Sequence, residues 1–288
     1  MDTADFVTLL NVIALVAIML SMGMQVKFQA VTASVRPVHR VTLGLLANYL
    51  LVPAVTVGLL ILFQAEPRVS AGFLILAVCP GAPISPPATT IAKGNVAWAI
   101  GMMVILAGLS ALLSPALLSL LLTRVAPESN LRIDFLGIVR TLLVAQMLPL
   151  AVGLGIHHWL PKLAQKIGKP LGMVANLLLL LLVGLILATQ YEMLAAVRLR
   201  GWMGMALLFF ASLGIGWLCG GTDVAIRKAL ALTTTARNAA VGLVIVNSNF
   251  PETAAVTAVV AYGLVSILGT FACALLLGKI IKIRSASE

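Results

Sequence analysis

The sequence predicts an all-α polytopic membrane protein, and three observations support this prediction. Hydrophobic residues make up 61% of the 288 residues, charged residues make up only 10%, and the mean hydropathy is +1.12. Soluble domains are about 45–50% apolar and about 25% charged. Apolar runs of about 20 residues, the length that a helix needs to cross a bilayer, follow one another along the chain. The composition therefore excludes a soluble enzyme, a nucleic-acid-binding protein and a disordered chain.

Seven apolar runs predict continuous membrane-spanning helices, and two further stretches predict interrupted ones. The continuous runs are 6–24, 42–63, 96–122, 134–158, 172–190, 202–219 and 254–281. The interrupted stretches are 70–93, which contains CPGAPISPP, and 222–249, which contains TTTARN. Single prolines within the continuous spans (Pro53, Pro115 and Pro149) predict kinks. The sequence thus predicts nine transmembrane helices.

The positions of the basic residues predict the orientation. With the N-terminus outside, twelve Lys and Arg residues fall in inner segments and five in outer segments. All eight lysines then lie inside, and seven of the nine acidic residues lie outside. Cytoplasmic loops carry an excess of Lys and Arg, so this separation supports both the orientation and the odd number of spans. We expect a multi-pass protein of the cell (inner) membrane, with its C-terminus in the cytoplasm.

The two interrupted spans are the third and the eighth, and their positions indicate an inverted repeat. We interpret the chain as two five-helix repeats, of which the first has lost its first helix, so that the pattern is 4+5. The fourth helix of the five-helix unit is then the broken one in each half. Repeats with an odd number of helices enter the membrane in opposite senses. Paired interrupted spans at corresponding positions are the best sequence indication of a binding site in a transporter.

The first interruption predicts a functional break. Four prolines and a glycine lie within residues 80–87, so this segment cannot remain regular helix. Irregular backbone at that depth is tolerated only where it is buried in protein or lines a wet cavity. Ser85 followed by Pro86 predicts an N-cap and the start of a new half-helix, whose N–H groups favour an anion. Pro83, Ile84, Ser85 and Thr89 are the candidate substrate-binding residues here.

The second interruption supplies the hydroxyls of Thr233, Thr234 and Thr235, the guanidinium of Arg237 and the amide of Asn238. A charged residue at the middle of a span costs roughly 2.5–3.5 kcal/mol on insertion scales and is a functional hypothesis by default. A structural arginine that is satisfied by backbone carbonyls is the alternative. No Asp, Glu or His is expected at the middle of a span, so an anionic substrate would provide the missing charge.

Other functions need features that this sequence does not offer. A membrane enzyme requires a nucleophile with a base, or a metal-binding cluster, and neither is expected at the middle of the spans. We therefore expect no enzymatic activity and no cofactor, with sodium as the one possible ion. The expected partners are a small organic anion and the lipid bilayer, without nucleic acid, and the chain acts as a monomer or a homodimer. A non-transporting membrane protein that binds an anion or regulates a partner stays an alternative.

The motifs resemble those of the bile acid:sodium symporter family. The resemblance rests on the order of nine spans, CPG at 79–81 before Ser85, AKGN at 92–95, and Asn238 in the second break. It implies two broken helices that cross in the middle of the membrane. It also implies a core domain, here 42–123 and 202–282, that moves against a panel domain, here 6–24 and 134–190. The resemblance further implies alternating access by this movement and organic anions as substrates.

The sequence departs from the sodium-coupled members of that family at the first break and in the next span. In those members the first break reads CPGG, followed by two residues and then Ser-Asn. This sequence has Ala82 in place of the last glycine and Pro86 in place of the asparagine. Two positions whose hydroxyls bind sodium fall on Ala99 and Met103, whose side chains cannot do so.

The second break departs further. The resemblance places a family glutamate position at Thr233 and a glutamine position at Arg237, and only Asn238 matches. Two unit charges about 6 Å apart at an effective dielectric near 20 repel by roughly 3 kcal/mol. Our hypothesis is that Arg237 replaces the coupling cation and makes the carrier sodium-independent. The alternative is a sodium-coupled symporter with Ser85, Thr89 and Thr234 as weak sodium ligands.

Overall fold

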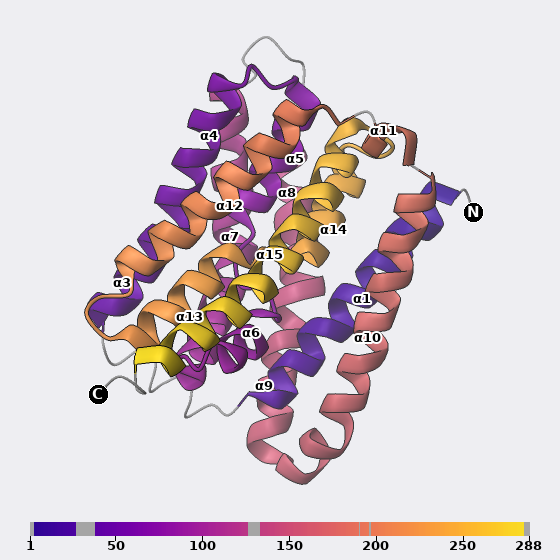
Figure 1. Cartoon of the computed structure of the whole chain (residues 1–288). Helices are drawn as coiled ribbons and strands as arrows, with labels where there is room; N and C mark the ends of the chain where they lie inside the picture. The colour runs from indigo at the N-terminus through magenta and orange to yellow at the C-terminus, as the bar shows by residue number, and fades with distance from the viewer. Residues whose placement is uncertain (1–2, 27–37, 126–132, 190, 196, 285–288) are drawn as a thin grey trace.

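The computed structural model describes residues 3–26, 38–125, 133–189, 191–195 and 197–284 (Figure 1). Within these ranges every regular element is a helix, and eight helices are long and apolar enough to cross a membrane. The protein is thus an all-helical polytopic membrane protein. The elements are α1 (Thr3–Gln25), α3 (Val38–Leu46), η1 (Ala47–Leu51), α4 (Val52–Leu62), α5 (Pro67–Val78), α6 (Ser85–Ile91), α7 (Val96–Val125), α8 (Phe135–Leu142), η2 (Leu143–Met147), α9 (Leu148–Trp159), α10 (Pro161–Thr189), α11 (Tyr191–Ala195), α12 (Leu199–Cys219), α13 (Val224–Thr235), α14 (Ala239–Asn249) and α15 (Ala254–Arg284).

The observed helices follow the predicted spans closely, with one exception in length. Helix α10 begins at Pro161, although the apolar run predicted a start at 172. Its first turns carry Lys162, Lys166 and Lys169, which are exposed and therefore do not oppose helix formation. The count of eight takes α13 and α14 together as one span, Val224–Asn249. The stretch 70–93 is not counted, because it is divided into α5 of 12 residues and α6 of 7 residues, separated by 79–84.

Two of the three predicted kinks coincide with a turn of π-helix. The π-helical segment η1 contains Tyr49, four residues before Pro53, and η2 contains Ala145, four residues before Pro149. A proline ring clashes with the carbonyl four residues earlier, and a π-turn at that carbonyl accommodates the missing hydrogen bond. Pro115, in contrast, lies within continuous helix in α7.

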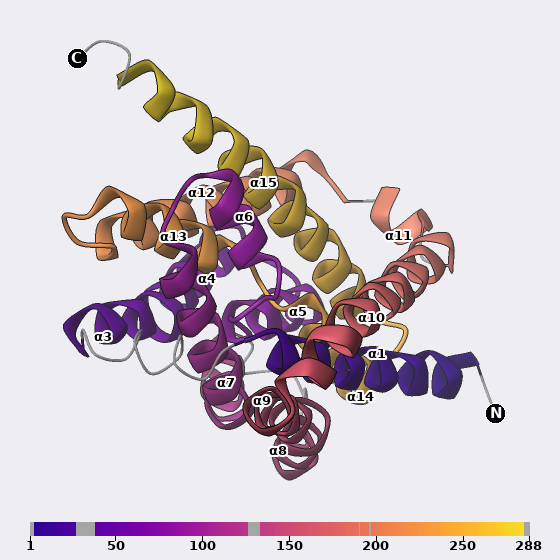
Figure 2. The same cartoon turned by 90° about the horizontal axis from the view of Figure 1, so that it is seen from below.

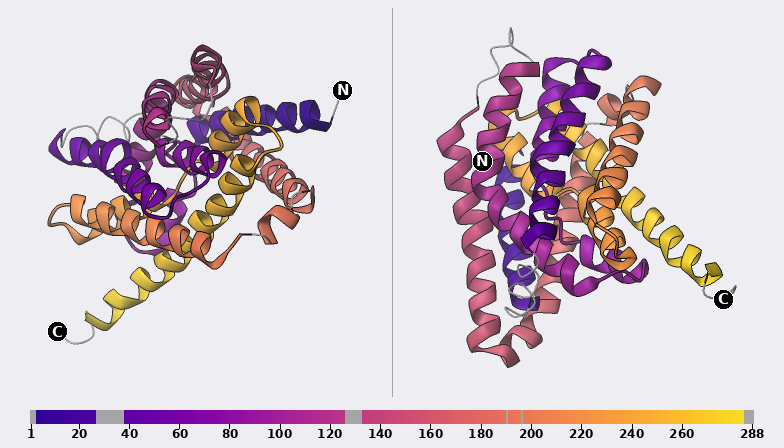
Figure 3. Two further views of the ribbon diagram at one scale, coloured as in Figure 1. Left: turned by 90° about the horizontal axis from the view of Figure 1, so that it is seen from above. Right: turned by 90° about the vertical axis from the view of Figure 1, so that its left-hand side faces the viewer.

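Helices that are distant in the sequence pack side by side. Helix α1 lies along α9 and α10, α12 lies along α13, and α5 lies along α15 (Figures 1 and 2). The C-terminal end of α15 extends away from the bundle (Figure 3). In the segment Val224–Asn249, which comprises α13 and α14, 94% of the most apolar stretch is buried. This pair of helices therefore lies inside the protein rather than against lipid.

Several segments with basic residues that were predicted to face inside lie at one end of the bundle. The turn between α6 and α7 and the start of α10 lie at the same end of the bundle as the C-terminus (Figure 1). Lys228, one of the twelve basic residues predicted in inner segments, lies in α13, where it is 1% exposed and its Nζ donates to the carbonyl of Ala92 at 2.6 Å. The basic residues Lys27, Arg36 and Arg132 lie outside the described residues.

Candidate functional site

The first break is shorter than the prolines predicted. Helix α5 ends at Val78 and α6 begins at Ser85, so Pro86 and Pro87 lie in the first turn of a helix, where proline is tolerated. Gly81 has φ +86°, and a Cβ at this position would lie 2.5 Å from the backbone nitrogen of Ala107. The break therefore depends on a glycine that can adopt this conformation and approach α7.

Ser85 does not cap α6, which contradicts the sequence-based expectation. The residue before the helix is Ile84, whose side chain forms no capping hydrogen bond. The N–H of Ser85 donates to Ala82, the N–H of Ala88 donates to Ile84, and the two prolines between them have no N–H. The start of α6 therefore offers no free N–H group to an anion. The buried Ser85 hydroxyl forms no hydrogen bond with any described residue and remains available for a ligand.

The second break contains neither proline nor glycine, and hydrogen bonds to α15 stabilise it. Helix α13 ends at Thr235, and α14 begins at Ala239. The Ser266 hydroxyl of α15 accepts from the Arg237 N–H at 3.0 Å and donates to the Thr235 carbonyl at 2.6 Å. The Asn238 side chain caps α14 by accepting from the Val241 N–H at 3.3 Å. These bonds satisfy backbone groups that an interrupted helix would leave unpaired.

The two breaks lie against each other. The Asn238 N–H donates to the Cys79 carbonyl at 2.9 Å, which joins the two broken segments directly. The guanidinium of Arg237 donates through Nη1 to the Ala77 carbonyl at 3.2 Å and through Nη2 to the Thr234 carbonyl at 2.5 Å. Ala77 lies in the last turn of α5 and Thr234 in the last turn of α13. The arginine thus connects the C-terminal ends of two half-helices.

Dipoles, rather than an acidic residue, compensate the charge of Arg237. Its side chain is 1% exposed, and within the described part of the chain it forms no ion pair. The C-terminal end of a helix carries a partial negative charge and stabilises a nearby cation. The Nε atom has no hydrogen-bond partner among the same residues. The guanidinium is therefore a fixed, buried cation held by carbonyl oxygens.

The threonines of α13 differ in their surroundings. The Thr233 hydroxyl donates to the Ala229 carbonyl of its own helix, and Thr235 donates to Leu232. The Thr234 hydroxyl instead accepts from Nδ2 of Asn48 in η1 at 3.3 Å, and therefore joins α13 to another span. Thr235 also accepts from the Thr270 hydroxyl of α15 at 2.9 Å.

The remaining candidates lie on the α6 side of the site. Pro83 and Ile84 are partly exposed, whereas Ser85 and Thr89 are buried, and the Thr89 hydroxyl donates to the Ser85 carbonyl at 2.8 Å. Ala99 and Met103 of α7 are buried as well. No hydrogen bond joins Ser85 or Thr89 to Thr234 among the described residues.

Sequence reasoning missed three residues that complete this site. Asn48 joins two spans through its bond to Thr234, as an interhelical hydrogen-bonding residue does, but its Oδ1 has no partner among the described residues. Ser266 and Thr270 are four residues apart in α15 and therefore lie on one face, which was the available signal. That signal is weak, because small hydroxyl residues commonly join helices in membranes. In the part of the chain that the structure describes, no group of His, Cys, Asp and Glu could hold a metal ion.

The free hydroxyl of Ser85 gives a direct test of ligand contact. Replacing Ser85 by Ala removes no hydrogen bond between described residues, so we expect the melting temperature to be unchanged. Ligand affinity should fall about fivefold, the effect of losing one hydrogen bond of about 1 kcal/mol. Ser110→Ala is the matched control, because the Ser110 hydroxyl accepts from Gln146 at 2.6 Å and its loss should lower stability instead. Thermal melting with and without ligand measures both effects, and unchanged affinity in Ser85→Ala would remove this residue from the site.

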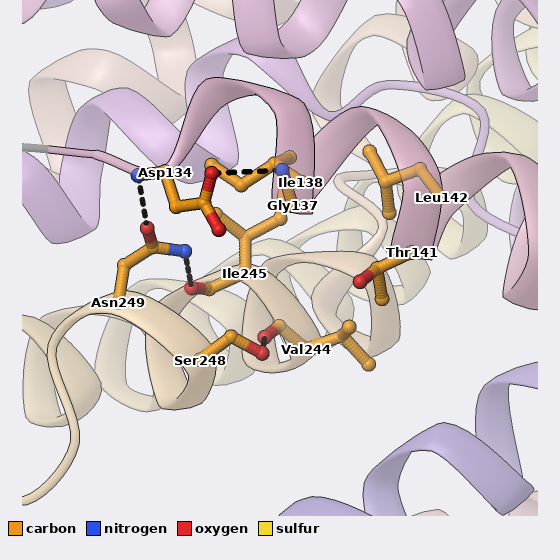
Figure 4. A pocket seen from close by; sticks show the side chains of 9 residues that line it. All are labelled: Asp134, Gly137, Ile138, Thr141, Leu142, Val244, Ile245, Ser248 and Asn249. Atoms are coloured by element: carbon orange, nitrogen blue, oxygen red, sulfur yellow. Dashed lines mark hydrogen bonds between the residues drawn. The ribbon is translucent and has the colours of Figure 1, made fainter.

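Helices α8 and α14 contact each other away from the two breaks, beside a small cavity of about 110 Å³ (Figure 4). The Asp134 carboxylate accepts from the Gly137 N–H at 2.9 Å and caps α8. The Asp134 N–H donates to Oδ1 of Asn249 at 3.0 Å, across the two helices. Figure 4 shows the Asn249 amide oxygen directed at the Asp134 backbone nitrogen, while the Asp134 carboxylate is directed at Gly137. This hydrogen bond connects α8 to the end of the second broken helix.

A comparison with known families shows which family this chain belongs to. The model of the sodium bile acid symporter family matches residues 12–197, which is more than half of the chain. The chain belongs to this family. The matched region includes the first broken helix and ends before the second, so Arg237 and Asn238 lie beyond it. Because the family is one of symporters, its membership agrees with the expectation of a protein that is not an enzyme.

Three curated relatives match this chain at low identity. The chain is 28% identical over 202 residues to the "Probable sodium/metabolite cotransporter BASS2, chloroplastic" of Oryza sativa subsp. japonica, covering 70% of this chain and 47% of that protein. It is 23% identical to the "Probable sodium/metabolite cotransporter BASS1, chloroplastic" of Arabidopsis thaliana, covering 83% and 59%. It is 24% identical to the "Uncharacterized sodium-dependent transporter YocS" of Bacillus subtilis, covering 83% and 74%. The matched part of this family member thus spans about half the length of the two plant proteins.

Proposed function

We propose that this family member carries a small organic anion, a carboxylate or a sulfonate, across the membrane by alternating access and without sodium. The observation that supports this proposal is the Arg237 guanidinium, which donates to the Ala77 and Thr234 carbonyls. In transporters with broken helices, unwound carbonyls and the C-terminal ends of half-helices are the groups that bind a coupling cation. Arg237 places a permanent positive charge in such surroundings.

This charge acts on both possible ligands of the site. A sodium ion about 6 Å away would be repelled by roughly 3 kcal/mol at an effective dielectric near 20, and an anion would be attracted by a similar amount. Arginine is always protonated in proteins, so the charge does not depend on the ion gradient. The carrier then works as a uniporter or an exchanger rather than as a symporter.

The substrate site combines the accessible edge of the first break with the polar groups of the second. Pro83 and Ile84 form the accessible edge, and Ser85 and Asn238 supply hydrogen-bonding groups. The Asn238 amide has an Nδ2 group without a partner among the described residues, which would donate to the substrate. Arg237 supplies the charge. The buried wall of the site consists of Thr89, Thr233, Thr234 and Thr235.

The transport cycle that we propose uses nine spans in a 4+5 inverted repeat. The core consists of 42–123 and 202–282, and the panel consists of 6–24 and 134–190. Packing supports this division, because α1 lies along α9 and α10, while α12 lies along α13 and α5 along α15. The bond between Asp134 and Asn249 joins the two parts and would break as the core moves. The termini lie at opposite ends of the bundle, which fits an N-terminus outside and a C-terminus in the cytoplasm (Figure 1). The carrier would act in the cell (inner) membrane, as a monomer or a homodimer.

Sodium coupling is the second candidate, and the names of the relatives favour it. All three describe sodium/metabolite cotransporters or a sodium-dependent transporter. In that case the free hydroxyl of Ser85, together with Thr89, Thr234 and backbone carbonyls, would bind the ion.

One experiment in two steps separates these functions. A thermal-shift screen of small carboxylates and sulfonates, with and without sodium, identifies a stabilising anion, because a ligand raises stability as its concentration exceeds its Kd. Uptake of that anion into proteoliposomes is then measured with sodium replaced by choline. We expect the same rate in both salts. A tenfold or greater loss in choline would establish sodium coupling, and binding without any flux would identify a non-transporting anion-binding protein.

A further inference from the structure

A cleft of about 550 Å³ lies between α4, α5, α12 and α15, away from the broken helices. It opens near the α4–α5 connection and the start of α12, at one end of the bundle (Figure 1). The residues that line it all lie outside the two breaks. Its volume is within the range of sites that bind small organic molecules, which is about 300–1,000 Å³. The cleft is therefore a separate site with the capacity for a ligand.

The walls of the cleft are apolar, and its position exposes it to the bilayer. Leu59 of α4, Phe73 of α5 and Leu208 of α12 contribute to the walls. Beside the cleft, Leu62 of α4 is 68% exposed and Phe210 of α12 is 61% exposed, so these helix faces lie against lipid. Acyl chains are the apolar molecules available there. An acyl chain gains little by leaving other chains for an apolar wall, so any selectivity must come from the mouth of the cleft.

The mouth of the cleft carries an excess of positive charge. Arg198 immediately precedes α12 and Arg200 is its second residue, and both are exposed. The Arg200 guanidinium lies 5.7 Å from the centroid of the Phe63 ring, and neither arginine forms an ion pair within the described part of the chain. Glu66 lines the same mouth, so two positive charges oppose one negative charge.

We propose that this cleft binds one anionic phospholipid of the surrounding leaflet. Arg198 and Arg200 hold the headgroup phosphate, for which the planar, permanently charged guanidinium is well suited. One acyl chain enters the cleft past Phe63 and lies against Leu59 and Leu208. The net positive mouth selects an anionic headgroup over a zwitterionic one, and Glu66 limits the strength of this selection.

Native mass spectrometry of the intact purified protein tests this proposal with phosphatidylglycerol and phosphatidylcholine of identical acyl chains. We expect one tightly bound phosphatidylglycerol and weaker binding of phosphatidylcholine. Because each Arg near a membrane surface contributes about 1 kcal/mol toward an anionic lipid, Arg198→Gln or Arg200→Gln should each weaken phosphatidylglycerol binding about fivefold. Glu66→Gln should strengthen it. Arg124→Gln, at an exposed position in the last turn of α7 at the same end, is the matched control and should change nothing.

A variant that fills the cleft makes the test independent of charge. A Cβ at Gly204 would meet only the Phe63 ring among the described residues, at 3.6 Å, so the side chain of Gly204→Leu enters the cleft without a backbone clash. We expect this variant to melt at the wild-type temperature or above it, because leucine favours helix more than glycine does, and to lose tight binding of both lipids. Equal binding of the two lipids by the wild type would overturn the proposal. Retention of phosphatidylglycerol by Gly204→Leu, or an equal loss in Arg124→Gln, would overturn it as well.

Discussion

Replacing Arg237 by Gln is expected to weaken the binding of carboxylate substrates by about 100-fold, which corresponds to roughly 3 kcal/mol of lost attraction. The guanidinium is the one charge among the described residues that is buried between the two breaks, held by the carbonyls of Ala77 and Thr234. Glutamine can still donate a hydrogen bond to one of these carbonyls, but it carries no charge. The substitution also removes the repulsion that opposes sodium, so the variant should show anion uptake that increases with sodium.

The stability of the same variant separates a functional arginine from a structural one. A buried charge without an acidic partner is costly to desolvate, so its removal should leave the melting temperature of the unliganded protein unchanged or raise it. Thermal melting in detergent and anion binding are measured on the same preparation. Arg140→Gln is the matched control, because Arg140 lies within the span of α8 and η2 but is exposed. A variant that binds anions normally but melts at a lower temperature would show that Arg237 serves the fold alone.

Replacing Gly81 by Ala is expected to destabilise the protein by about 2–5 kcal/mol and to abolish transport. The backbone at Gly81 has φ +86°, and a residue with a Cβ pays roughly 1–2 kcal/mol for a left-handed conformation. The added Cβ would also lie 2.5 Å from the Ala107 nitrogen and 2.9 Å from the Met103 carbonyl, so α7 must move away from the break. Overpacking of this kind typically costs about 1–3 kcal/mol.

Gly58→Ala provides the control for this prediction. Gly58 lies within α4, and a Cβ added there would meet no atom of another described residue within 4 Å, so alanine fits at this position. Its higher helix propensity should stabilise the protein by about 0.5–1 kcal/mol. Thermal melting and proteoliposome uptake of both variants are compared with the wild type. Normal melting of Gly81→Ala would show that the first break does not depend on the glycine.

The first break was predictable because its cause is local. Proline and glycine restrict the backbone wherever they occur, so the interruption between α5 and α6 was evident from the residues themselves. Its extent was not, because prolines in the first turn of α6 are compatible with helix. The capping role expected for Ser85 was wrong for a related reason. The carbonyls of Ala82 and Ile84, which accept the N–H groups at the start of α6, come into position only when the break has folded.

The second break depends on partners that are distant in the sequence. Nothing within TTTARN stops a helix, and the interruption is held by Ser266, which is 29 residues from Arg237. The polar character of Arg237 and Asn238 was apparent, but their contacts with Ala77 and Cys79 were not. The partner of Asn48 was not apparent for the same reason, since its bond to Thr234 joins residues 186 positions apart.

The sequence alone indicated that this protein is an all-helical membrane protein, where its long helices lie, and that two of its spans are interrupted. Hydropathy and proline geometry depend on residues that are close together in the chain, so they can be evaluated without a fold. Only the tertiary structure decided that the two breaks touch and that Arg237 is held by the ends of two half-helices. Those contacts join residues up to 160 positions apart, and their geometry follows from how the helices pack.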